Sequence, residues 1–173
     1  MMVNRYVVHA AQPDGTEGPI VAFAEQKRMA FKEQVTLFTD ESRRHVLAAF
    51  KARKVIDLSS EYDVTGAAGE PIGYFRKDFR ASLLRSTWHL RQSGLPTMVG
   101  SERNAMVAVL RRFVEQLSWM PYHFDFGVGA QIAFSVERRR TIRDMYIVDI
   151  HDPRIDRRLV VAMAVALDAL QAR

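Results

Sequence analysis

Apolar and polar residues alternate over short stretches of this chain. Residues 84–91, 132–137 and 146–151 each place apolar side chains at every second position, which is the period of a half-buried strand. In the second stretch, Ile132 and Phe134 fall on the predicted buried face. From Ile20 onward, turn residues separate such stretches every ten residues or so, a spacing typical of an all-β sandwich or barrel. The pattern therefore predicts a mainly β domain of antiparallel strands.

Two stretches resemble imperfect copies of one hairpin. Residues 62–72 and 124–132 each run from an aromatic–Asp–apolar strand end through a glycine-containing turn into a return strand. Glycine supplies the positive φ that a tight strand reversal needs. We expect the fold to be built in part from repeated hairpins.

One internal segment has a helical pattern instead. Residues 101–117 open with Ser and Glu and then place apolar side chains at helical spacing, with Arg111, Arg112 and Glu115 off that stripe. This pattern predicts an amphipathic helix near 101–117 on the outside of the domain.

The last segment has a different helical signal. It begins at Asp152-Pro153, a capping residue followed by proline in the first turn, and runs through the nine apolar residues 159–167. Because this run is apolar on all sides and rich in alanine, we expect a helix surrounded by protein. A closed antiparallel sheet around a central helix satisfies that requirement and leaves no exposed strand edges.

The size of the chain, 173 residues, is that of one domain. The turn-rich residues 1–19 are interpreted as a leader or edge segment, and residues 20–173 as the barrel domain. The chain has no cysteine and no readable secretory signal, which favours a cytoplasmic location. Its longest apolar run, nine residues, is far below the roughly 20 that a membrane-spanning helix needs.

The order of several weak motifs resembles the LURP-one-related proteins. This family is a branch of the Tubby C-terminal-like superfamily, which also contains the phospholipid scramblases. The resemblance runs from about Ile20 to the end of the chain and implies a barrel of about twelve antiparallel strands threaded by the carboxy-terminal helix. The motifs are Phe38-Thr39-Asp40-Glu41, residues 46–50, 62–64, 69–73 and 83–88, and Asp152-Pro153-Arg154.

The resemblance implies less about function than about fold, because one fold hosts many roles. Tubby members bind phosphoinositides through basic side chains, scramblases are linked to calcium and lipid movement, and many LURP-one-related proteins have no assigned activity. The chain has no Asp-rich loop with calcium-site spacing, so a scramblase-like lipid-handling role is kept only as an alternative.

Basic residues follow the predicted strand ends, and the formal net charge is +5. If they gather at one rim or face, they would attract a lipid headgroup phosphate through charge and forked hydrogen bonds. The alternative interpretation is that they keep strand edges soluble. The candidate ligand-binding residues are Arg76, Lys77, Arg80, Arg85, Arg138, Arg139, Arg140 and Arg143.

Catalytic signals are weak. The five histidines lack the paired spacing of a helical zinc site, and there is no Gly-x-Ser-x-Gly elbow, so no catalytic residue, metal or cofactor is expected. The enzyme hypothesis left open is a site at the barrel mouth involving His89, His151 or Asp168.

The sequence thus predicts a non-enzymatic binding module, with anionic phospholipid or phosphoinositide at a membrane surface as the expected partner. The alternative is single-stranded nucleic acid, because Tyr74, Phe75 and Trp88 lie beside basic clusters. The oligomeric state is left open.

Overall fold

The computed structural model describes residues 3–27, 34–53, 61–78, 87–103, 123–139 and 145–171. These residues form one sheet in which each of eleven strands is hydrogen-bonded to the next in chain order, always antiparallel. A single helix, α2 (Arg157–Gln171), follows the last of these strands. The strands are β1 (Val3–Ala11), β2 (Glu17–Lys27), β3 (Gln34–Phe38), β4 (Val46–Ala52), β5 (Glu61–Gly66), β6 (Pro71–Asp78), β7 (Thr87–Gln92), β8 (Met98–Glu102), β9 (His123–Val128), β10 (Gln131–Arg139) and β11 (Met145–Ile150).

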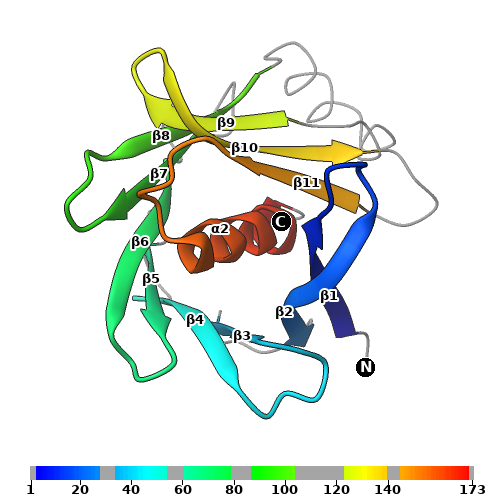
Figure 1. Cartoon of the computed structure of the whole chain (residues 1–173). Helices are drawn as coiled ribbons and strands as arrows, with labels where there is room; N and C mark the ends of the chain where they lie inside the picture. The colour runs from blue at the N-terminus through cyan, green and yellow to red at the C-terminus, as the bar shows by residue number, and fades with distance from the viewer. Residues whose placement is uncertain are drawn as a thin grey trace, which may run out of the picture.

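The sheet curves around α2, which lies along its axis (Figure 1). Leu159, Met163 and Leu167 of the helix are fully buried, as the sequence pattern predicted. The prediction of a mainly β domain around an enclosed carboxy-terminal helix is therefore confirmed. Eleven strands lie within the described residues, against about twelve expected, and their hydrogen-bond ladder does not continue from β11 to β1.

Helix α2 packs closest to β4, β5 and β6. Gly73 of β6 permits this approach, since a β-carbon there would lie 3.1 Å from Cδ2 of Leu159 and 2.3 Å from the carbonyl oxygen of Arg91. A larger residue at this position would clash with the backbone of β7 and crowd the side chain of Leu159.

The inner face of the sheet is rich in aromatic rings. Phe75 contacts Phe50, Tyr62 and Trp88, with ring centroids 5.4, 5.3 and 6.0 Å away, and all four rings are buried. A second group of buried rings follows on β9 and β10, where Phe126 stacks on Phe134 at 4.5 Å. These side chains, together with α2, fill the interior of the described sheet.

The two look-alike stretches form the hairpins β5–β6 and β9–β10, so this prediction is confirmed. Gly69 and Gly129 turn them with φ of 81° and 59°. The structure extends the repeat, because an arginine precedes each hairpin: Arg53 and Arg103 each bind the aspartate of the aromatic–Asp motif through Nε and Nη2, at 2.6–2.8 Å.

The predicted start of the outer helix at residue 101 is wrong. Ser101 pairs with Thr87 and Asp125, and Glu102, only 1% exposed, pairs with Phe124, so both residues complete β8. The remainder of that predicted helix, residues 104–117, lies outside the described residues. The residues interpreted as a leader, 1–19, include all of β1 and the first residues of β2.

The predicted cap of the last helix is also wrong. Asp156 is the capping residue, because its Oδ1 accepts a hydrogen bond from the Arg158 amide at 2.8 Å. Asp152 instead caps the preceding turn, accepting from the amide of Arg154 at 3.0 Å. The Arg154 side chain, which also binds Asp152, lowers the pKa of that carboxyl to about 2.

The two ends of the sheet differ. Short turns with positive-φ glycines at residues 15, 69, 94 and 129 lie at one end, where α2 begins. We call this the turn end. The last turn of α2 lies at the opposite end, where β6 and β10 finish and β1 and β11 start.

Candidate functional site

The structure describes four of the eight basic residues selected from the sequence. Arg76 and Lys77 end β6, and Arg138 and Arg139 end β10, at the same end of the sheet but with β7, β8 and β9 between the two pairs. The other four, Arg80, Arg85, Arg140 and Arg143, lie outside the described residues.

These four residues occupy different faces of the sheet. Arg76 is exposed on the outer face, whereas Lys77 lies opposite the buried Trp88, with Nζ 5.8 Å from its ring centroid. Arg138 is half-buried opposite Tyr146, and the backbone of Arg139 lies opposite Met145. Of the three predicted side chains whose burial is described, Arg76, Lys77 and Arg138, Arg76 is the exposed one.

Arg76 is part of a basic group that the sequence did not single out. Lys51 on β4, Asp63 on β5, Tyr74 on β6 and Arg91 on β7 form one register row across the outer face. Arg76 follows Tyr74 by two residues and therefore lies on the same face. At about 4.8 Å between strands, this row is about 14 Å wide. We call Lys51, Arg76 and Arg91, with Tyr74 between them, the outer basic patch.

The two nearby carboxylates, Asp63 and Glu61, share one arginine, Arg53. Arg53 binds Asp63 at 2.6–2.8 Å and also forms an ion pair with Glu61. These contacts raise the pKa of Arg53, chiefly through the hydrogen bond to Asp63. Its guanidinium also lies over the ring of Tyr74, 5.0 Å from the centroid.

The three cations of the outer basic patch have no such partner. Within the described ranges, Lys51, Arg76 and Arg91 are exposed and have no hydrogen bond or ion pair to a carboxylate. Four cations, Lys51, Arg53, Arg76 and Arg91, lie near two carboxylates, Glu61 and Asp63, so this part of the outer face has an excess of positive charge. It is suited to binding a ligand that carries several negative charges.

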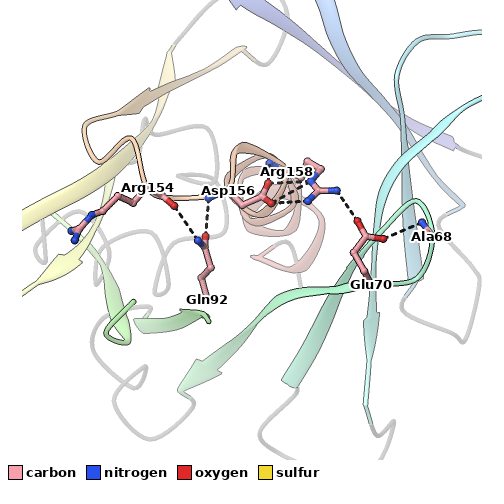
Figure 2. Close-up of polar contacts among 6 residues, drawn as sticks. All are labelled: Ala68, Glu70, Gln92, Arg154, Asp156 and Arg158. Atoms are coloured by element: carbon pink, nitrogen blue, oxygen red, sulfur yellow. Dashed lines mark hydrogen bonds and ion pairs between the residues drawn. The ribbon is translucent and has the colours of Figure 1, made fainter. Parts of the chain in front are cut away.

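A second polar group lies where α2 enters the sheet (Figure 2). The Gln92 side chain donates to the carbonyl of Arg154 at 3.0 Å and accepts from the amide of Asp156 at 2.7 Å. Arg158 bridges Asp156 and Glu70, at 2.8 and 2.9 Å. These polar groups satisfy one another, so this helix-entry cluster positions α2 and leaves little for a ligand to bind.

The helix-entry cluster makes stability depend on pH. Arg158 lowers the pKa of Asp156. The pKa of Glu70 is lowered first by a hydrogen bond from its own backbone amide and then by Arg158. A carboxyl whose pKa is lowered on folding contributes stability above its unfolded pKa and loses it as the pH falls through the folded value. We therefore expect Arg158→Met to reduce the loss of urea midpoint that the wild type shows between about pH 7 and about pH 3.

Arg157→Met is the matched control, because Arg157 is the adjacent exposed arginine and has no ion pair among the residues described. It should keep the wild-type pH dependence. Equal pH dependence of the Arg158 variant and the wild type would contradict the role assigned to this cluster.

A shallow groove of about 260 Å³ lies at the turn end. Leu95, Ile132 and Pro153 give it apolar walls, and His151 lies on its rim. Asp152 and Arg154 also line it, but they are paired with each other at 2.7 Å. The groove therefore lacks an uncompensated charge, and the outer basic patch is the better candidate for an ionic ligand.

The three residues of the enzyme hypothesis do not meet. His151 lies at the turn end, whereas Asp168 lies near the end of α2, at the opposite end of the sheet. His89 is on β7, 3.4 Å from Asp78. The three residues therefore do not form one common site, because the length of α2 separates His151 from Asp168.

The described residues hold neither a metal-binding cluster nor a membrane-spanning helix. No group of three or more His, Asp or Glu side chains in the described ranges could hold a metal ion. Helix α2 falls short of the length and apolar character needed to span a bilayer.

Sequence reasoning missed Lys51, and it placed Arg91 only on a polar strand face. The available signal was the alternation, which turns Arg91 and Arg76 outward. The sequence could not show that Lys51 of β4 and Arg91 of β7 lie in one row, because that depends on how strands β4 to β7 pair with one another.

Comparison with known proteins bears on the fold and the family. No curated protein and no solved structure is similar enough to be matched to this chain. A protein-family model does match, over residues 20–168. The match covers most of the chain, including all of β3 to β11, most of β2 and much of α2. The chain therefore belongs to the LURP-one-related family.

Proposed function

We propose that this protein is a non-enzymatic binding module that docks on anionic phospholipid headgroups at a membrane surface through the outer basic patch. The observation that carries the proposal is a set of exposed cations, Lys51, Arg76 and Arg91, on one face of the sheet, none of which is hydrogen-bonded or ion-paired to a carboxylate of the described residues. Basic residues close to an anionic membrane contribute about 1 kcal/mol each.

The filled interior supports a surface ligand. Helix α2 and the aromatic rings occupy the space inside the described sheet, with Phe75, Trp88 and Met163 at 0% exposure. A lipid-sized ligand therefore has to bind on the outside. The extended strands β4–β7 present their outward side chains over a continuous surface, which suits an interface made of many headgroups.

Single-stranded nucleic acid is the alternative, and the burial of its expected stacking residues disfavours it. Phe75 and Trp88 are fully buried, which leaves Tyr74 as the outward ring of the three. Proteins that bind single strands usually stack successive bases on several exposed aromatic rings. One ring beside Arg53 does not provide such a platform.

Vesicle sedimentation tests the proposal. The wild type should sediment with phosphatidylcholine vesicles that contain phosphatidylserine or a phosphoinositide, and much less with phosphatidylcholine alone. Arg76→Gln/Arg91→Gln should lower partitioning to the anionic vesicles by about tenfold or more, because it removes two basic side chains from the interface. Higher salt should weaken wild-type binding.

The matched control is Arg44→Gln/Arg157→Gln. It removes the same net charge from exposed positions in the β3–β4 turn and the first turn of α2, away from the outer basic patch. This variant should bind like the wild type. Equal losses in both variants would mean that net charge alone acts, and equal sedimentation with neutral and anionic vesicles would reject lipid binding.

A short oligonucleotide in a fluorescence anisotropy assay separates the two ligand classes. Salt-sensitive binding of the oligonucleotide, lost in Arg76→Gln/Arg91→Gln and stronger than vesicle binding, would replace lipid by nucleic acid.

A further inference from the structure

The strand count leaves a seam in the sheet. Each strand runs antiparallel to the next from β1 to β11, so the first and eleventh strands run in the same direction. Because antiparallel neighbours must alternate, β1 and β11 cannot complete the sheet with an antiparallel ladder. No backbone ladder joins them within the described residues. We call the break between β1 and β11 the seam.

One carboxylate reaches both sides of the seam. Tyr6 of β1 donates its hydroxyl proton to Oδ2 of Asp168 at 2.9 Å. Tyr146 of β11 donates to the other carboxylate oxygen, Oδ1. Asp168 lies near the end of α2 and is half-buried. We call these three side chains the clasp.

The helix face that carries Asp168 is the least covered one. Val161, Ala164 and Asp168 are spaced by three and four residues, so they share one side of α2, and all three are half-buried. The other residues between 159 and 170 are buried. The helix backbone lies nearest to β4, β5 and β6, so the sheet covers α2 well on that side and less completely toward the seam.

From these observations we infer that the clasp holds the sheet together at the seam, and that the seam is where the sheet opens first. Separating two neighbouring strands elsewhere breaks a run of backbone hydrogen bonds. Separating β1 from β11 breaks the two hydroxyl–carboxylate bonds of the clasp. Such differences in local contacts let one region of a protein open while the rest stays folded. Opening the seam would leave β1 attached to the sheet through β2 alone and β11 through β10 alone.

Hydrogen exchange measured by mass spectrometry tests this inference on the full chain. Tyr6→Phe/Tyr146→Phe removes the two hydroxyl groups and little else. We expect it to speed exchange of the amides in β1 and β11 by about tenfold or more, because hydrogen bonds to a charged group are among the stronger ones. Without the clasp, β1 is held by β2 alone and β11 by β10 alone, so each strand separates more often from the neighbour to which its amides are bonded. The amides of β5 and β6, on the opposite wall, should exchange at the wild-type rate. Asp168→Ala should give the same pattern.

The control is Asp149→Asn, which removes an exposed acidic side chain from β11 without touching the clasp. It should leave exchange unchanged. Because both variants break the same clasp, adding Tyr6→Phe/Tyr146→Phe to Asp168→Ala should have no further effect on β1 and β11. Unchanged exchange in β1 and β11 of the double phenylalanine variant would overturn the inference. So would an equal increase in every strand, since that would be a loss of global stability.

Discussion

Ala166→Asp is expected to lower the free energy of unfolding by about 3–5 kcal/mol, the cost typical of an uncompensated buried charge. Ala166 belongs to α2 and is fully buried inside the sheet. The surrounding side chains are apolar, so the new carboxylate would find no partner. Domains of this size are stable by about 5–15 kcal/mol, so the variant would lose a large part of its stability.

Ala164→Asp is the matched control for this prediction. Ala164 is on the same helix, two residues earlier, but on the half-buried face that points toward the seam. Its carboxylate would keep some contact with water, although it lies one turn from Asp168, a like-charge pair that costs roughly 0.2–0.5 kcal/mol. Urea unfolding should show a much smaller loss than for Ala166→Asp. Equal losses would mean that the sheet encloses the helix on all sides alike.

Phe75→Ala should be comparably destabilising, by about 3–5 kcal/mol. Phe75 is fully buried and lies within 6.0 Å of three other rings, so its removal leaves a cavity and ends three ring contacts at once. The surrounding rings belong to different strands, β4, β5 and β7, which limits how far they can collapse into the space. Urea denaturation, followed by tryptophan fluorescence or by circular dichroism, measures the loss.

Tyr74→Ala tests whether that loss comes from the core. Tyr74 is the preceding residue of β6, on the outer face, where its principal contact is the guanidinium of Arg53. Its removal should cost about 1 kcal/mol, the value of an exposed cation–π contact. A larger loss for Tyr74→Ala than for Phe75→Ala would contradict the assignment of the main packing of β6 to the inner face of the sheet.

Which face of a strand is buried could be predicted from the local sequence. Alternation predicted the burial of Trp88 and Phe134, because successive side chains of a strand point to opposite faces regardless of its partners. The same reasoning failed at Ile132, which is 40% exposed. A register irregularity between Ile132 and Phe134 turns Ala133 inward instead. Such a bulge depends on the pairing of β10 with β9, which no local pattern reveals.

For helix α2, too, the sequence predicted one property and not another. Its composition was enough to predict a helix enclosed by protein, because an all-round apolar helix is stable in water only when it is covered. Its first residue was not predictable from the Asp152-Pro153 pair. The helix begins after Asp156 because Gln92 and Glu70, distant in the sequence, meet Asp156 and Arg158 there.

What the sequence determined by itself is therefore the local part: the period of the strands, the apolar character of the closing helix and the family. The tertiary structure alone decided which outward side chains become neighbours. Lys51 and Arg91 are 40 positions apart in the chain, yet they share one register row of the sheet, and Asp168 joins Tyr6 to Tyr146 across the seam. The physical reason is that strand order and register are set by pairing between distant segments, so a surface patch or a clasp exists only after the sheet has formed.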